Sequence, residues 1–194
     1  MKTRARRHPA AFTLIELMAV ITIIVILAGI VIGGMGYVNE KQAREKAKVQ
    51  IALLSKALEE YKLDNGTYPP TVDKPGTFTA AGTSTSAILF DYLYWNSDRD
   101  AQGGTADTDQ KYYVPELDPL NNKQGWTTNT PAASANTKIT DPWGSEYCYR
   151  TATKADGSAN ANTQNPDFDL WSIGKDTKSV PGTPSDPSNK DDVR

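Results

Sequence analysis

The sequence predicts an α+β protein, in which one long N-terminal helix carries a small, loop-rich antiparallel β head. Three observations support this fold class. An apolar run covers residues 12–38, apolar side chains recur at helical spacing through 39–64, and residues 65–194 are polar and turn-rich with short alternating segments. The mean hydropathy of −0.53 averages these unlike parts, so each part is interpreted separately.

Residues 1–11 form a basic leader. Lys2, Arg4, Arg6 and Arg7 stand in it with no acidic side chain among them. An excess of Lys and Arg before an apolar segment predicts a cytoplasmic N-terminus, with the residues after the segment on the other side of the membrane.

The run from Phe12 to Val38 contains one ionisable side chain, Glu16. A helix of this length is about 40 Å long, whereas the hydrocarbon core of a bilayer is ~30 Å thick. A secretory signal peptide has a shorter apolar region that ends in a small-residue cleavage site, and this run has no such end. The run is therefore predicted to be a membrane anchor. The glycines in 29–36 suit close helix packing or local stretching.

Residues 39–64 continue the helix as an amphipathic segment. No Pro or Gly interrupts it, and Asn65-Gly66 supplies a stop signal. A coiled coil is one reading, but the apolar stripe is short, which favours packing against strands. The stripe predicts the face that packs on the head: Ala47, Ile51, Leu54, Leu58 and Tyr61.

The head, 65–194, is predicted to hold one short helix and at least two strands. Capping residues precede helically spaced apolar residues in 84–93. Residues 145–151 and 167–172 alternate like strands. Cys148 is expected to be a half-buried small hydrophobe, on the opposite face from its two tyrosine neighbours.

Cysteine and histidine usage excludes several kinds of chemistry. The single Cys148 has no partner for an intrachain disulfide, and the single histidine, His8, lies in the leader. Ser-His or Cys-His catalysis and His-ligated zinc are therefore not predicted. Residues 65–194 hold 17 acidic and 11 basic side chains, so the head has no basic patch to attract nucleic acid.

The start of the apolar run resembles a processing signal. The segment AFTLIEL, residues 11–17, follows the basic leader and precedes a long apolar helix. This pattern resembles the class III signal of type IV pilins and type II secretion pseudopilins, and it implies their pilin-like fold. It also implies that a prepilin peptidase cuts between Ala11 and Phe12 and methylates the new Phe12 amine. The family usually has Gly before the cut, so Ala11 departs from its pattern.

The same resemblance gives Glu16 a function in assembly. A carboxylate in hydrocarbon costs roughly 2.5–3.5 kcal/mol, so it needs a partner. The family's partner is the free N-terminal amine of a neighbouring subunit, here that of Phe12, and the pair sets the axial register of packed helices. The alternative is a Glu at headgroup level that the positive helix N-terminus stabilises.

A second resemblance lies in the head. The segments DPWGSEYCYR, residues 141–150, and DFDLWSIGKD, residues 167–176, resemble the C-terminal signature of the major type II secretion pseudopilin. A type IV or competence pilin is the alternative. The absence of a disulfide argues against it, because type IV pilins usually close this region with one and this chain cannot form it. The C-terminal β and loop region is taken as 139–194, whereas the variable region 71–138 matches no pattern of the family.

Major pseudopilins bind calcium in the loop after the last strand, so the resemblance implies a calcium site here. Calcium takes six to eight oxygen ligands. By position, the Ile173 carbonyl and the Asp176 carboxylate match the family's first ligands, and beyond them the loop departs from its pattern. Asp186, Asp191 and Asp192 are the candidates to complete the site. The alternative is that these acids belong to a solvated tail.

The predicted function is structural. The resemblance implies an inner-membrane protein, with its N-terminus cytoplasmic and its head periplasmic, that assembles through its helix into a homopolymeric, pilus-like filament for protein secretion. Its implied partners are the prepilin peptidase, minor pseudopilins and the inner-membrane secretion platform. No enzymatic activity is predicted. A signal-anchored binding module that never polymerises is the alternative from a different class.

Overall fold

The computed structural model describes residues 13–71, 78–79, 85–95, 111–119, 125–128, 137–154, 156–183 and 185–194. The chain divides into two compact units, Met1–Gln42 and Ala43–Arg194. The first unit holds the start of the long helix, and the second holds the rest of that helix together with the head.

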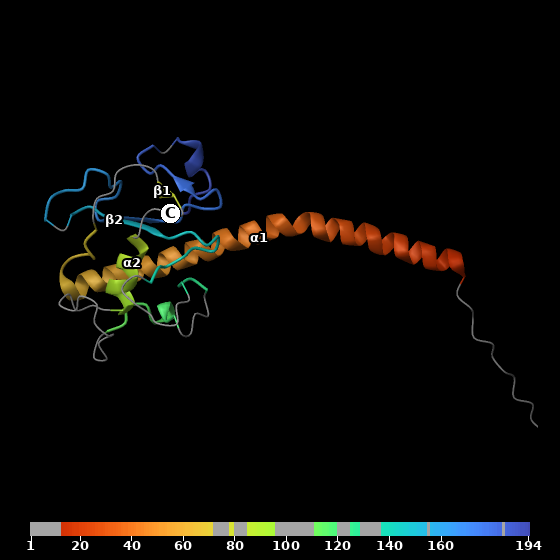
Figure 1. The fold of residues 1–194 in the computed structure, drawn as a ribbon, viewed down its shortest axis with the longest axis horizontal. Helices are drawn as coiled ribbons and strands as arrows, with labels where there is room; N and C mark the ends of the chain where they lie inside the picture. Colours follow the sequence, from red (N-terminus) through yellow and green to blue (C-terminus); the bar gives the residue numbers. More distant parts are fainter. Residues whose placement is uncertain are drawn as a thin grey trace, which may run out of the picture. The chain divides into compact units, whose positions relative to one another are not determined.

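Helix α1 spans Leu14–Asn65 (Figure 1). It passes through Gly29–Gly36 without a break, so the prediction of one helix is confirmed. Its end follows from Gly66, which has a φ of +77° and whose N–H donates to the Lys62 carbonyl at 2.7 Å. A left-handed residue of this kind ends many helices, and glycine adopts it without steric cost.

In the first unit, the large apolar side chains described along α1 are exposed, from Leu14 at 78% to Val38 at 50%. By length and composition, α1 contains a segment able to cross a membrane. A helix that is apolar on all sides needs an apolar surrounding, either lipid or other helices.

The core of the second unit forms on one face of α1. The five residues of the predicted stripe are all buried, with Ala47, Leu54 and Leu58 at 0% exposure. They share one hydrophobic cluster with residues of the head, which gather around this part of α1 in Figure 1. Burying each leucine contributes about 1.5–3 kcal/mol, so this face holds the head on the helix.

Helix α2, Thr85–Phe90, lies where the sequence predicts a short helix. It continues as a π-helix, η1, over Asp91–Trp95, and a 3-10 helix, η2, follows at Pro115–Leu117. The side chains that α2 and η1 bury in the core are Leu89, Phe90 and Leu93.

Strands β2, Cys148–Thr151, and β3, Phe168–Trp171, pair antiparallel, with Cys148 opposite Trp171. Both strands are predicted, although each is shorter than expected. Tyr149 on β2 faces the main core, whereas Cys148 packs with Trp171 and Ile173 in a second cluster. Cys148 is 1% exposed, so it is fully buried rather than half-buried.

A second sheet joins the variable region to the C-terminal loop. Strand β1, Phe78–Thr79, pairs antiparallel with β4, Lys178–Ser179. Neither strand is predicted by the sequence analysis, because two residues carry no periodicity. The pairing brings a segment of 71–138 onto the loop that follows β3.

Candidate functional site

The first candidate site is the start of α1. Thr13 precedes the helix, and its Oγ1 accepts a hydrogen bond from the Glu16 N–H at 3.3 Å. The same hydroxyl lies 3.4 Å from Glu16 Oε2, to which it donates. Thr13 therefore caps the helix, and the Glu16 carboxylate is held in the first turn, where the helix dipole favours a negative charge.

The cap at Thr13 was not predicted from the sequence. The signal for it was the Thr-x-x-Glu spacing of residues 13 and 16, which is typical of helix starts. Ala11 and Phe12, between which cleavage is predicted, lie outside the described residues. The pairing of Glu16 with a neighbouring amine stays a prediction.

The second candidate site is the C-terminal loop, residues 173–194. Two of the five predicted calcium ligands, Asp176 and Asp191, are in contact beside Gly174, and a third, Ile173, precedes this glycine in the chain. Asp191 Oδ2 accepts a hydrogen bond from the Asp176 N–H at 2.8 Å. A Cβ on Gly174, next to Ile173, would lie 2.6 Å from the Asp191 carbonyl oxygen and 2.7 Å from its Oδ2. The glycine thus makes room for two oxygens of one acidic residue.

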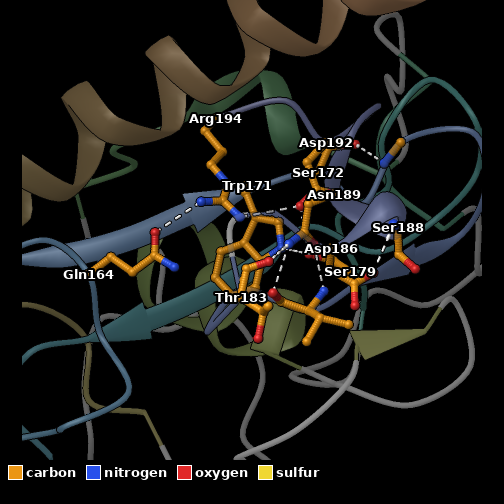
Figure 2. A network of polar contacts seen from close by, with 12 residues as sticks. Gln164, Trp171, Ser172, Ser179, Thr183, Asp186, Ser188, Asn189, Asp192 and Arg194 are labelled. Atoms are coloured by element: carbon orange, nitrogen blue, oxygen red, sulfur yellow. Dashed lines mark hydrogen bonds and ion pairs between the residues drawn. The ribbon is translucent and has the colours of Figure 1, made fainter.

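Asp192 is a buried carboxylate in the same loop, and its side chain is 2% exposed. Its Oδ2 accepts a hydrogen bond from Ser179 Oγ at 2.6 Å, and the Arg194 guanidinium lies 3.5 Å from the same oxygen (Figure 2). Its Oδ1 is buried without a hydrogen-bond partner among the described residues. Burial raises the pKa of Asp192, because the charged form loses hydration.

Asp186 has a structural task of its own. Its Oδ1 accepts the Ser188 N–H at 2.9 Å and caps a 3-10 helix, η3, over Pro187–Asn189. The Asn189 side chain then bonds to both backbone groups of Val180, at 2.7 and 2.8 Å. These bonds fasten the loop beside β4.

The segment after η3 is also fastened to the rest of the head. Ser172 and Val193 exchange two backbone hydrogen bonds, at 2.9 and 3.1 Å. Arg44 on α1 donates to the Asp192 carbonyl at 3.3 Å. The Trp171 indole donates to Ser179 Oγ at 3.1 Å, so the buried strand β3 contacts the same network (Figure 2).

The oxygen-rich composition of the loop suits a hard cation such as calcium. Asp191 supplies a carboxylate and a carbonyl beside Gly174, and Asp192 has an unsatisfied oxygen. In the part of the chain that the structure describes, however, no group of three or more His, Cys, Asp or Glu side chains is arranged to hold a metal ion. Carbonyl oxygens and water would have to supply the remaining ligands.

A helix able to cross a membrane, with a capped carboxylate in its first turn and a small β head following it in the sequence, is typical of pilin-like proteins. The fold therefore places this chain in the pilin-like class. Comparison with known families supports this class, because the prokaryotic N-terminal methylation motif matches residues 6–32. A second family, type II secretion system protein G, matches residues 35–88.

Type II secretion system core protein G of Escherichia coli is 31% identical over 144 residues, which are 74% of this chain and 73% of that protein. The protein of the same name from Pseudomonas aeruginosa is 30% identical over 174 residues, 89% of this chain and 88% of its own length. No solved structure gives a significant match. The chain belongs to the family of type II secretion system core protein G, so its resemblance to the major pseudopilin is confirmed.

Proposed function

We propose that this protein is a structural subunit of the pseudopilus of a type II secretion system. It anchors in the inner membrane through α1, with its head in the periplasm, and it polymerises through this helix after processing. The observation that carries the proposal is the match to core protein G over most of both chains. In this account the protein works by assembly and has no catalytic centre of its own.

The start of α1 supports polymerisation by a helix contact. Glu16 has only its own helix cap as a described partner, and one hydrogen bond donated by the neutral Thr13 hydroxyl does not neutralise a carboxylate. In an apolar filament core, the unmet charge favours a cation at the same depth. The amine that cleavage before Phe12 creates in a neighbouring subunit has the required charge.

The partners follow from the same account. A prepilin peptidase makes the Phe12 amine and methylates it. A homopolymer then grows from the inner-membrane secretion platform, with minor pseudopilins in the same filament. The methylation motif at residues 6–32 supports the first of these steps.

Two variants of Glu16 test the proposal by separating charge from hydrogen bonding. Glu16→Gln keeps an oxygen that can accept from Thr13 but removes the charge, whereas Glu16→Leu removes both. We expect both chains to insert and to be cleaved, and both to give few filaments, because the amine has lost its counter-ion. The measurements are the mass of the membrane-bound chain and the filament yield after shearing. Wild-type yield from Glu16→Gln would contradict the charge pairing, and wild-type yield from both variants would show that Glu16 has no function in assembly.

We also propose that the C-terminal loop binds calcium through the Ile173 carbonyl, the Asp176 and Asp191 oxygens and the Asp192 carboxylate. Support comes from the buried, unpartnered Oδ1 of Asp192 and from the Asp191 oxygens that face Gly174. Bound calcium would neutralise carboxylates that otherwise repel one another in this loop. Asp186 is left out of this ligand set because it caps η3.

Thermal unfolding of the full chain in detergent, with calcium and with a chelator, tests this site. A ligand at 100 times its Kd that binds only the folded state stabilises it by about 2.7 kcal/mol. We expect a rise in Tm that Asp176→Ala abolishes and Asp156→Ala keeps, since Asp156 is an exposed acid outside the loop. Equal Tm values with calcium and with the chelator would contradict the proposed site.

A further inference from the structure

Arg194, in the C-terminal loop, lies beside Asp192, whose carboxylate is a ligand of the proposed calcium site. Arg194 Nη1 donates to Gln164 Oε1 at 2.9 Å, and Nη2 lies 3.5 Å from Asp192 Oδ2 (Figure 2). The arginine side chain is 40% exposed, whereas that of Asp192 is 2% exposed. One end of this ion pair can therefore move into solvent, and the other cannot.

We propose that Arg194 is the built-in counter-ion of Asp192, and that it competes with calcium for this carboxylate. The inference rests on the calcium site proposed above. In this proposal Arg194 sets the calcium affinity of the site. It also predicts that the loop keeps its contacts with the head when calcium is scarce, because Arg194 then balances the charge of Asp192.

The geometry of Asp192 is the first reason for competition. Ser179 Oγ occupies one side of Oδ2, and Arg194 lies on the same oxygen, so only Oδ1 is left for a metal. A calcium ion on Oδ1 would place a divalent charge and a guanidinium on one carboxylate. Like charges this close in a buried site repel strongly, so binding of one weakens binding of the other.

The two arginines that contact Asp192 differ in what they bind. Arg44 donates to the backbone carbonyl of Asp192, so its bond does not depend on the carboxylate. Arg194 contacts the carboxylate itself, and its other described partner is the neutral Gln164. Calcium should therefore displace Arg194 from Asp192 while Arg44 keeps the loop on α1.

Calorimetric titration of the full chain in detergent with calcium chloride tests the proposal. Arg194→Gln removes the competing cation, and Lys190→Gln is the matched control. Lys190 is exposed in the same loop, and its backbone N–H, not its side chain, donates to the Pro187 carbonyl. We expect Arg194→Gln to bind calcium about two- to fivefold more tightly than Lys190→Gln, as the loss of a half-exposed ion pair implies.

The Tm of Arg194→Gln and of the wild type, each measured with a chelator and with calcium, separates competition from a purely structural contact. With a chelator, Arg194→Gln should unfold at a lower temperature than the wild type, because Asp192 has lost its counter-ion. At saturating calcium this difference should vanish, because the metal has already displaced the arginine.

Three results would overturn the competition. Equal calcium affinities for Arg194→Gln and Lys190→Gln would show that Arg194 does not share the site. A difference in Tm that persists unchanged at saturating calcium would show that Arg194 stays on Asp192. If neither the wild type nor Arg194→Gln binds calcium, the metal site itself fails and the competition with it. The chelator melts then still report whether Arg194 stabilises the loop.

Discussion

At the residue scale, Asp141 shows how one buried carboxylate holds a turn. Its Oδ1 accepts the backbone N–H groups of Trp143 at 3.0 Å and Ser145 at 2.8 Å, and Ser172 Oγ donates to its Oδ2 at 2.5 Å. Gly144 has a φ of +89°, a conformation that suits glycine. The Asp-Pro-Trp-Gly sequence therefore forms a turn, and Asp141 links this turn to Ser172, directly after β3.

The pH dependence of stability follows from this burial. Burial raises the pKa of Asp141 above its ordinary value of 3.8, and its hydrogen bonds offset only part of that rise. The folded state therefore binds the proton more tightly than the unfolded state, so this group's contribution to stability falls as the pH rises above about 4. We expect the wild type to lose stability relative to Asp141→Asn as the pH rises above about 4, measured by urea unfolding.

Asp156→Asn is the control for this measurement. Hydrogen bonds from Ser158 lower the pKa of the exposed Asp156, so its contribution to stability changes only below about pH 5. Its difference from the wild type should stay flat above that pH. A flat difference for Asp141→Asn as well would contradict the assigned direction.

Gly174 gives a second prediction at this scale. Gly174→Ala would force a Cβ to 2.6 Å from the Asp191 carbonyl oxygen at a φ of +69°, so we expect a loss of about 1–3 kcal/mol. Gly157 has a similar φ of +80° but open space around it. Gly157→Ala should therefore cost less, about 1 kcal/mol. Chemical denaturation measures both, and equal losses would show that the close approach to Asp191 has no energetic effect.

At the scale of elements, α1 follows most directly from the sequence. The apolar run from Phe12 to Val38, the helically spaced stripe from Ala47 to Tyr61 and the stop signal at Asn65-Gly66 were enough to predict its length and its buried face. Strands β2 and β3 were also predicted from the sequence, because alternating apolar and polar side chains indicate a half-buried strand. Their exact ends were not predicted, because the ends depend on pairing with a partner strand.

The second sheet and the loop network could not be predicted in the same way. β1 and β4 have two residues each, and they pair across about 100 positions of sequence. The burial of Asp192 depends on Ser179, Arg194 and the backbone pair of Ser172 with Val193. Neighbouring acids in a polar sequence give no sign of such partners, so the sequence leaves a solvated tail as the alternative to a ligand site.

Two leucines on α1 test the packing of this element. Leu54 is 0% exposed and Leu63 is 84% exposed. We expect Leu54→Ala to lower the free energy of unfolding of the head by about 2–5 kcal/mol, because a cavity would remain between α1 and the head. Leu63→Ala should change it by less than about 0.5 kcal/mol. Urea unfolding followed by tryptophan fluorescence measures both values, and similar losses would contradict the assigned packing face.

At the scale of the whole molecule, the two units perform different tasks. Residues of the first unit give an apolar helix with one carboxylate near its start, which suits membrane insertion and then helix packing. The second unit has its own core and a C-terminal loop fastened by side-chain bonds instead of a disulfide. Assembly through the helix and stability of the head can therefore be altered by separate substitutions.

The most direct test of the central claim is the intact mass of this protein in a sheared filament fraction from cells that make it with its secretion system. The account predicts a chain that begins at Phe12, carries one added methyl group and is recovered in filaments. A chain that keeps residues 1–11 and stays in the membrane fraction would contradict it, since an unprocessed chain has no free amine at Phe12 to pair with Glu16.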